Sequence, residues 1–356
     1  MNESAQRTRS DESTYRAWVR SEGLDVILGH HVPDLRAVEV KPWQRTGGLG
    51  CFINHDDSDR SNDCYVCDVP AGESLRPQRH LHEAMFYVLS GRGATSVWQD
   101  DGRRQNFEWA AGSLFAIPLN AWYEHFNSSG DNPARLLAVT NAPAVINMFV
   151  NAKFVFDCPY DFTDRFKGES GYFDAEGNLE GRVWESNFVP DARGFELLDY
   201  KERGAGGKNI KFKLAKNTMW AHISEFPVGT YKKAHRHGPG AHVVILGGTG
   251  YSLMWKEGEP IQRYDWSEGS MIIPPDRTFH QHFNTGTTPA RYLALRYTGA
   301  RKRDAATGLP MSTISTRLGG DQIEYEDEDP QVRRMYEEEC RRNGVEFGMA
   351  PHYQSQ

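Results

Sequence analysis

The sequence predicts a chain dominated by β-structure, folded into two tandem barrels with short flanking helices. A gap-free internal repeat is the first observation, because window 78–127 matches window 235–284 at an offset of 157 residues (235 − 78 = 284 − 127). Repeats this long are copies of a whole domain. Short strand-like runs separated by Gly, Pro, Asn and Asp turns are the second, and they are typical of barrels and sandwiches. The third is the length of 356 residues, enough for two cores.

Five segments follow in order along the chain. We expect a helical lead-in, a first barrel, an inter-domain segment, a second barrel and a tail, over residues 1–35, 36–142, 143–208, 209–300 and 301–356 respectively. The inter-domain segment carries no copy of the repeat but is rich in Phe, Tyr and Trp. A composition of this kind favours a packed segment over a flexible linker.

A helix is predicted in the tail, over residues 330–343. Asp329 is an N-cap candidate, and Pro330 suits the first helical position. Arg342 lies in the last turn, where a cation complements the helix dipole, and Gly344 can end the helix.

The composition narrows the function classes. Hydrophobic content of 38% and charged content of 25% are those of a soluble globular protein. A net charge of −7 without basic clusters argues against nucleic acid or an anionic membrane as partner. No apolar run approaches the roughly 18 residues that span a bilayer, and the polar first residues lack a signal core. We expect a cytoplasmic protein with no membrane or nucleic-acid partner.

The five cysteines are scattered and odd in number, which suggests a reducing compartment. Cys64 and Cys67 have C-x-x-C spacing and Cys51 lies nearby. A structural zinc site would need a fourth ligand. We therefore expect buried thiols that pack as small hydrophobic side chains, with a structural metal as the alternative.

The two copies of the repeat differ in the residues that can bind a metal. The second copy has three histidines where the first has Gln, His and Tyr (His235, His237 and His280 against Gln78, His80 and Tyr123). Residues i and i+2 of a strand project to one face, so His-x-His pairs on neighbouring strands can converge. Neutral imidazoles bind Fe, Zn, Cu, Ni and Mn, and three ligands leave open coordination positions. We predict a metal site at these three histidines; solvent-exposed histidines are the alternative.

A fourth histidine of the second copy, His282, lies on the same strand face as His280. We expect it to act as an acid or base beside the substrate rather than as a ligand. In the first copy, an out-of-register site is conceivable, with ligands His80, His82, Glu83 and His125. The loss of two aligned ligands predicts instead a barrel that serves packing, dimerisation or shaping of the other cavity.

Two segments of the second copy resemble the motifs of the cupin superfamily: HRHGPGAHVVILGGTG (235–250) and GSMIIPPDRTFHQHFN (269–284). The common cupin ligand set is three His and one Glu, and Ala241 stands here at the Glu position. In this respect, and in His-Arg-His and aromatic-His-x-His-x-Asn, the chain is similar to gentisate 1,2-dioxygenase-like bicupins. The resemblance implies two cupin barrels (double-stranded β-helix, jelly-roll) and a three-His Fe(II) site, with Mn, Ni, Cu and Zn as alternative metals.

Two features depart from that group. Its amino-terminal cupin holds the iron, whereas here the carboxy-terminal copy is the intact one. Gln281 also occupies the middle of the second motif, where the group often has Asp.

The resemblance implies an Fe(II)-dependent, extradiol-type dioxygenase of aromatic-compound catabolism that cleaves a hydroxylated aromatic acid, gentisate- or salicylate-like, with O2. The carboxylate of such a substrate needs a cation to bind it. Arg277 and Arg296 are the candidates, in addition to His282 as acid or base, since Arg binds carboxylates bidentately. A structural ion pair is the alternative for each arginine. The alternative function is a metal-dependent bicupin of other chemistry, either oxidative C–C cleavage of a dicarbonyl or an isomerase, lyase or decarboxylase; a non-catalytic binding or storage cupin comes third. We expect a small-molecule substrate and O2 as partners, and a homodimer or homotetramer.

Overall fold

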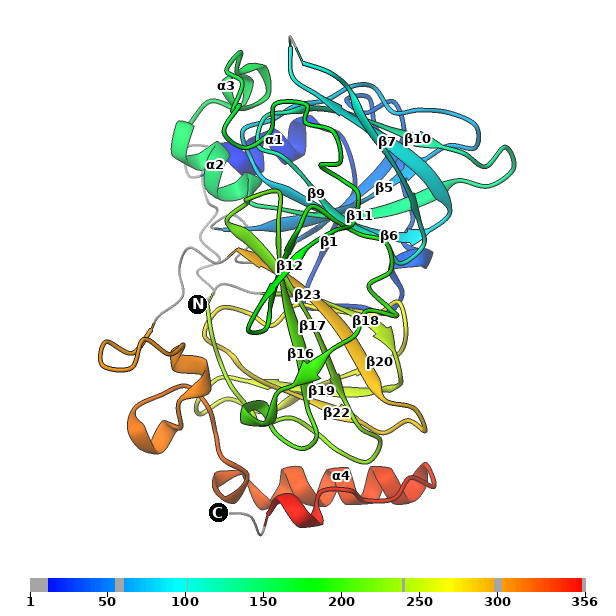
Figure 1. Cartoon of the computed structure of the whole chain (residues 1–356). Coiled ribbons are helices and arrows are strands. Elements are labelled where there is room, and N and C mark those ends of the chain that lie inside the picture. The colour runs from blue at the N-terminus through cyan, green and yellow to red at the C-terminus, as the bar shows by residue number, and fades with distance from the viewer. Residues whose placement is uncertain (1–11, 55–60, 101, 239–240, 298–302, 354–356) are drawn as a thin grey trace, which may run out of the picture.

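The computed structural model describes residues 12–54, 61–100, 102–238, 241–297 and 303–353. Two β domains lie one above the other, the first uppermost in Figure 1. Of the four α-helices in the described residues, three gather at the top left of the view and the fourth lies across the bottom. The helices are α1 (Thr14–Ser21), α2 (Ala142–Phe149), α3 (Ala152–Asp157) and α4 (Pro330–Arg342).

The first domain contains an eight-stranded sheet in the order β1-β4-β5-β11-β6-β9-β14, with β3 paired to β4, and a three-stranded sheet β10-β7-β8. The strands are β1 (Val26–Leu28), β3 (Lys41–Pro42), β4 (Leu49–Asn54), β5 (Asp63–Val69), β6 (Ala84–Ser90), β7 (Arg92–Trp98), β8 (Gln105–Ala110), β9 (Leu114–Ile117), β10 (Trp122–Asn127), β11 (Ala134–Thr140) and β14 (Phe188–Val189).

The second domain repeats this plan. Its nine-stranded sheet has the order β12-β13-β16-β17-β23-β18-β21-β2, with β15 paired to β16, and its three-stranded sheet is β20-β19-β22. The strands are β2 (His31–Val32), β12 (Asn178–Glu180), β13 (Val183–Ser186), β15 (Leu198–Asp199), β16 (Lys208–Leu214), β17 (Met219–Phe226), β18 (His242–Gly247), β19 (Gly250–Trp255), β20 (Gln262–Trp266), β21 (Met271–Ile272), β22 (Phe279–Asn284) and β23 (Ala290–Tyr297). The predicted β-dominated class with two barrels is confirmed.

The two domains exchange short strands. β2 comes from the lead-in but pairs with β21 of the second domain. β14 comes from the inter-domain segment but pairs with β9 of the first domain. The lead-in, which the sequence indicated as helical, thus also contributes strands to both sheets, because its apolar residues complete sheet edges that would otherwise be unpaired.

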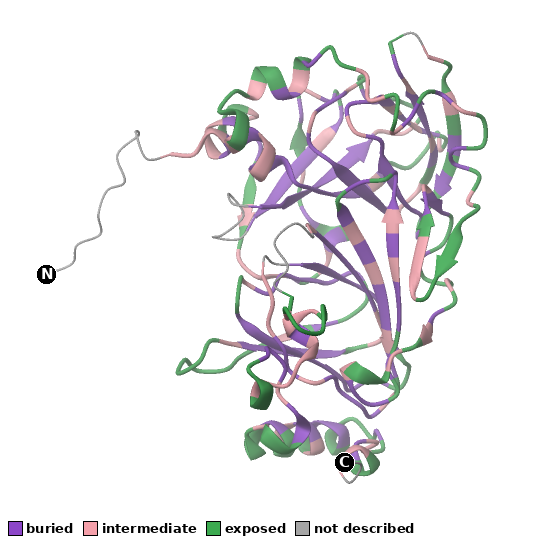
Figure 2. Cartoon of the chain, turned by 60° about the vertical axis from the view of Figure 1, so that its left-hand side comes forward, coloured by how far each residue is buried: buried purple, intermediate pink, exposed green. Residues whose placement is uncertain are grey.

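Side-chain alternation in the large sheets creates two environments. On β17, Ala221 and Ile223 join a core shared by both domains, whereas His222 and Ser224 face the interior of the second barrel. β5 of the first domain contributes Cys64 to the same shared core. The large sheets therefore pack back to back, and the strands in the middle of the molecule are largely buried (Figure 2).

The tail covers the far end of the second barrel. α4 begins after Asp329, whose side chain accepts a hydrogen bond from the Gln331 amide (2.8 Å). The buried Tyr336 hydroxyl donates to the carbonyl of Asn284 (2.6 Å), so the helix is fixed to the end of β22. In the described part of the chain, no helix has the length and apolar character needed to span a bilayer.

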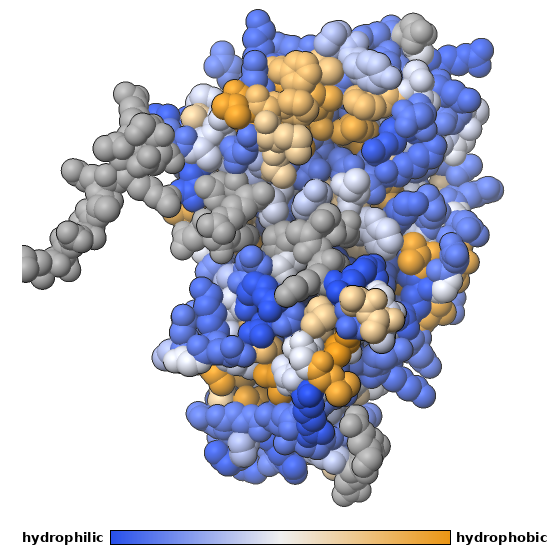
Figure 3. Space-filling model, turned by 90° about the vertical axis from the view of Figure 1, so that its left-hand side faces the viewer, coloured by the Kyte–Doolittle hydropathy of each residue, from blue (hydrophilic) through white to orange (hydrophobic). Residues whose placement is uncertain are grey.

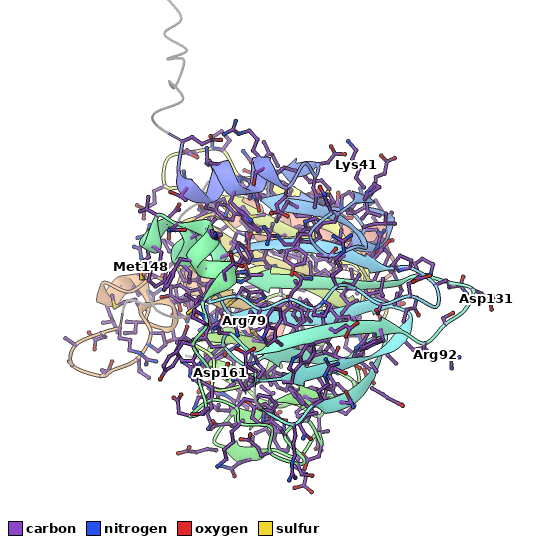
Figure 4. The ribbon with its side chains drawn as sticks, turned by 90° about the horizontal axis from the view of Figure 1, so that it is seen from above. Lys41, Arg79, Arg92, Asp131, Met148 and Asp161 are labelled. Atoms are coloured by element: carbon purple, nitrogen blue, oxygen red, sulfur yellow. The ribbon has the colours of Figure 1, made fainter. Side chains whose placement is uncertain are left out.

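An apolar patch lies on the outer surface of α2 and α3 (Figure 3). The exposed fraction is 73% for Met148 and 71% for Val150, and Phe149 and Phe154 are exposed beside them. Seen from above, Met148 lies at one edge of the molecule and Asp131 at the opposite edge (Figure 4).

Candidate metal centre and substrate cavity

Three histidines converge inside the second barrel. His235 forms an antiparallel bridge with His280 on β22, with N···O distances of 3.1 and 2.9 Å. His237 follows two residues later, and one potential ligand atom from each imidazole lies within 4.8 Å of the others. Gln78 and Tyr123 form the equivalent bridge in the first barrel. Residues that are aligned in the sequence repeat therefore occupy equivalent positions in the two barrels. Of the described residues, only these three histidines form a cluster of this kind.

The hydrogen bonds of two of these imidazoles suit metal binding. Nδ1 of His280 donates to the Thr278 carbonyl (3.0 Å), and Nδ1 of His235 donates to the Lys233 carbonyl (3.3 Å). Because a carbonyl can only accept, Nε2 of each ring keeps its lone pair. Burial lowers the pKa of His280 to about 4 and that of His235 well below its usual value, so both rings are neutral near pH 7. A neutral imidazole held by a carbonyl is the form that ligates metals.

The surroundings leave room for an ion with open coordination positions. Ala241 is buried and lines the same cavity as the three histidines. In the cupin motif that the sequence resembles, this position is the Glu of the common ligand set, and here it is a methyl group. The three imidazoles therefore fit a divalent transition metal, with space beside it for a ligand from solution.

The imidazole of His282 has a different environment. Its Nδ1 lies 2.7 Å from the Ser252 hydroxyl, which also accepts a hydrogen bond from Nε1 of Trp266 (3.0 Å). Tryptophan can only donate, so the serine proton is directed to Nδ1 and the ring proton is assigned to Nε2. His282 lines the cavity and is outside the three-histidine cluster. It therefore offers a donor to a bound molecule.

The cavity beside the histidines has a volume of about 260 Å³. That is slightly below the roughly 300–1,000 Å³ of pockets for drug-sized ligands, and suits a molecule with one ring. Its wall comes from the inward faces of β16, β17 and β23 and from the tail: Asn209, Lys211, His222, Ser224, Tyr292, Ala294, Arg296, Leu309, Pro310, Ser312 and Thr313.

Arg296 lines this cavity from β23, as its position on the strand after the second motif suggested. His242 pairs with Leu295, so the antiparallel register places Arg296 beside Ala241. Its Nε is buried and has no hydrogen-bond partner among the described residues. A buried donor without a partner has a large cost, which a bound anion would remove.

Arg277 occupies a different place from that expected. Its two Nη atoms donate to the carboxylate of Asp321 (2.8 and 3.1 Å), and it is not part of the cavity wall. Asp321 also accepts from Nε of Arg236 (2.8 Å). The backbone of Arg277 has a positive φ of 58°, which directs the residue toward the tail. The prediction that Arg277 contacts substrate is therefore replaced by its structural alternative, an ion pair that holds the tail.

The sequence analysis missed four cavity cations: Arg182, Arg203, Lys211 and Lys232. Arg203 comes from a 3-10 turn (Lys201–Arg203) outside the repeat, and no local signal marks it. Lys232 is 3% exposed and stands where the first domain has Leu75: the Lys232 amide donates to the His282 carbonyl (3.1 Å) as the Leu75 amide does to His125 (2.9 Å). A lysine at a core position of one repeat was a signal that could have been noticed.

The first barrel has no comparable site in its described residues. Both ring nitrogens of His80 are engaged, Nε2 with the Tyr123 hydroxyl (3.0 Å) and Nδ1 with the His82 carbonyl (2.6 Å). Glu83 points away and accepts from the Thr218 amide (2.8 Å) of the other domain. The cavity beside His80 has a volume of only about 10 Å³, about one water molecule.

His125 is the first-barrel counterpart of His282. Its Nδ1 bonds Thr95 (2.7 Å), which accepts from Trp109 (2.9 Å). The ring lies among Phe86 and Phe115, and burial lowers its pKa to about 3. The first barrel thus keeps the hydrogen bond between a hydroxyl and the histidine Nδ1, although aromatic side chains fill its interior.

The cysteines behave as small core residues. All five are free and buried, as expected for thiols that pack as hydrophobic groups.

Fold and site together have the plan of a bicupin: two cupin-like barrels in tandem, with a histidine cluster in the second that can hold a metal. Residues 65–140 match the family model described as a cupin domain.

Known proteins similar to the chain have different activities. One relative, 5-aminosalicylate 1,2-dioxygenase of Comamonas sp, is 29% identical over 87 residues, which are 24% of this chain and 21% of the relative. The match thus spans about a fifth of that relative's length. A solved oxalate decarboxylase has a TM-score of 0.51 at 12% identity, over 78% of this chain and 79% of its own. The oxalate decarboxylase of Bacillus subtilis, solved in work on its Mn(II) centres, has a TM-score of 0.50 at 12% identity over the same shares. At such identity, the structural likeness concerns the fold.

Proposed function

We propose that the protein is an Fe(II)-dependent dioxygenase that cleaves the ring of a hydroxylated aromatic acid with O2. The observation that carries the proposal is a three-histidine cluster with no carboxylate among its described members, which opens into a cavity lined by Arg296, whose Nε has no hydrogen-bond partner in the described residues. The partial likeness to 5-aminosalicylate 1,2-dioxygenase supports an aromatic acid as substrate class.

The metal would be held by His235, His237 and His280. Fe(II) with three imidazole ligands supplies open coordination positions and the redox chemistry by which O2 reacts with an electron-rich ring. The protein contributes position and charge. Arg296 is placed to receive the substrate carboxylate, because Arg binds carboxylates through parallel N–H donors.

His282 is placed to bind the ring hydroxyl of the substrate. With its proton on Nε2, it can donate a hydrogen bond to an ionised hydroxyl and so hold the negative charge of the substrate in place. Ser252 and Trp266 hold the ring in this orientation. Tyr292, whose ring centroid is 5.2 Å from that of His282, closes this side of the cavity.

The deciding experiment is anaerobic loading with Fe(II) followed by O2 uptake over a panel of salicylates, gentisates and hydroxynaphthoates. We expect O2 consumption with at least one acid and a ring-opened product by mass spectrometry. Zn(II)-loaded protein is the matched control and should be inactive, because zinc has no redox chemistry.

The alternative is a metal-dependent bicupin of other chemistry, such as oxidative C–C cleavage of a dicarbonyl, or an isomerase, lyase or decarboxylase. Turnover with Zn(II) or Mn(II) under strict anaerobiosis would contradict the dioxygenase and favour the non-redox reactions. Release of CO2 from oxalate by the Mn(II)-loaded protein is the specific assay for a decarboxylase.

A further inference from the structure

The cavity holds a second group of cations besides Arg296. Lys232 and Arg203 both line it, and in the described residues neither forms an ion pair with a carboxylate. Among the described residues of the wall, the one acid is Glu202, which is 3.9 Å from Arg182. Nη2 of Arg203 donates to the Ser312 hydroxyl (3.3 Å), whereas Nη1 is buried and has no hydrogen-bond partner in the described part of the chain.

Burial of the charged Lys232 side chain would be unfavourable in free energy if the residue served packing alone. Its ammonium lies over the rings of Tyr292 (5.0 Å) and Phe226 (5.3 Å). Burial lowers the pKa of Lys232, and the nearby Arg203 disfavours its charge further. The corresponding position in the first domain is filled by Leu75. Lys232 is buried and Arg203 is partly buried, and two neighbouring cations without an acid between them repel each other, which a bound anion would relieve.

The two cationic groups lie at different ends of the cavity. Arg296 and Tyr292 are four residues apart on β23 and point to the same face. At roughly 3.3 Å per residue, their Cα atoms are about 13 Å apart. Lys232 packs on Tyr292, near the His282 end, whereas Arg296 lies beside Ala241. A monocarboxylate occupies one end only.

We infer that the natural ligand carries two anionic groups on one ring, most simply a hydroxylated aromatic dicarboxylic acid, with one carboxylate on Arg296 and the other between Lys232 and Arg203. The inference rests on the proposed function for the aromatic ring, but the two-anion requirement comes from the cavity charges alone.

Equilibrium binding of unreactive ligands to the Zn(II)-loaded protein tests this by calorimetry at low ionic strength. The ligands are phthalate, isophthalate and terephthalate, with benzoate and 3-methylbenzoate as controls of equal ring size. We expect at least one dicarboxylate to bind about 10- to 100-fold tighter than its monocarboxylate controls, the range for one charge-assisted contact. Equal affinities for all five ligands would overturn the inference.

Lys232→Met and Arg203→Met should each remove that advantage and leave the affinity for benzoate nearly unchanged. Arg296→Met should weaken all the ligands. Lys213→Met is the matched control: it lies on β16 two residues from a cavity lysine, pairs with Glu185 (3.0 Å) and is outside the cavity wall. If Lys232→Met binds the best dicarboxylate as tightly as the unmodified protein, the second anion site is not at Lys232.

Stability without ligand gives an independent readout. Because Lys232 is buried without an acid, Lys232→Met should raise the melting temperature of the ligand-free protein while it lowers dicarboxylate affinity. If Lys232 had a purely structural role, Lys232→Met would lower both the melting temperature and the dicarboxylate affinity. A tight dicarboxylate without O2 uptake would retain the inference and reject the dioxygenase. O2 uptake with a monocarboxylate, without a preference for dicarboxylates in binding, would support the dioxygenase and reject the two-anion inference.

Discussion

Two histidines that lie two residues apart on β22 have hydrogen-bond partners that assign their protons to different nitrogens. His280 donates through Nδ1 to a carbonyl and keeps an Nε2 lone pair, whereas His282 accepts at Nδ1 from Ser252 and carries its proton on Nε2. Strand periodicity put both on one face, but only their hydrogen-bond partners distinguish a ligand from a donor.

Removal of a ligand should empty the metal site. We expect His235→Ala or His280→Ala to lose nearly all metal after anaerobic loading, measured by inductively coupled plasma mass spectrometry. His80→Ala is the control and should retain one metal per chain, because both its ring nitrogens already have partners in the protein. Metal lost from His80→Ala but kept in His280→Ala would show that the site lies in the first domain.

Removal of His282 should leave the metal and slow the reaction. We expect His282→Ala to keep its metal and its melting temperature, while kcat falls by roughly 10²–10⁴-fold, the usual contribution of an acid–base group. Metal content, melting temperature and kcat on this one variant separate a role on the bound substrate from ligation or packing. An unchanged kcat with metal retained would exclude His282 from the mechanism.

Ser252 acts through His282. Ser252→Ala removes the partner of Nδ1, so the tautomer and the ring orientation are no longer fixed, and we expect kcat to fall roughly 10- to 100-fold with metal content unchanged. Thr95→Ala deletes the same contact to His125 in the first barrel and should leave kcat unaltered. Equal losses in the two variants would indicate a general effect on stability.

At the level of elements, the tail encloses the second barrel. Four residues of the tail form part of the cavity wall, namely Leu309, Pro310, Ser312 and Thr313. Asp321 ties the following segment to Arg236 and Arg277. Further on, Glu328 lies between β22 and α4 and accepts from Gln281 and from the Tyr231 hydroxyl. Polar contacts as well as apolar packing therefore fix the tail.

Tail docking should depend on pH through Glu328. Burial raises the pKa of this carboxyl to about 7, from an ordinary value of 4.5. The folded state thus holds the proton more tightly than the unfolded state, and stability is lost as pH rises from 4.5 to about 7. We expect Glu328→Gln, which cannot ionise, to flatten the decline in melting temperature between pH 5 and 8. Glu338→Gln, an exposed change on α4, should follow the unmodified protein; parallel profiles for all three would contradict this role.

At the scale of the whole molecule, the domains share a core rather than touching at a surface. Strand exchange by β2 and β14 and the apolar backs of both large sheets join them, and Glu83 of the first domain accepts from the amides of Thr218 and Met219. The barrel without a histidine cluster therefore supports the wall of the barrel that has one.

We also propose that the protein is a homodimer or homotetramer. Exposed apolar side chains on α2 and α3 form the kind of patch that association covers (Figure 3). Light scattering after size exclusion should give a mass twice or four times the chain mass of 40.4 kDa. A mass equal to one chain at micromolar concentration would contradict it.

The sequence by itself determined the fold class, the two-domain plan and the asymmetry of the domains. All three follow from the pattern of residues along the chain, because strand periodicity is a local property and the repeat can be aligned without gaps. The repeat aligns Gln78 with His235 and Tyr123 with His280, and these pairs form the same bridge in both barrels. The convergence of His235, His237 and His280 followed from the same alignment. Capping residues likewise located α4 to within one residue of its end.

Only the tertiary structure decided which cations face the cavity. Arg277 and Arg296 were equivalent in sequence terms, but a positive φ directs the first to Asp321, whereas strand register leaves the second beside Ala241. Arg203 enters from a turn outside the repeat, and Lys232 from a core position. The direction of a side chain depends on neighbours distant in the chain, so no local pattern could have assigned these residues to one site.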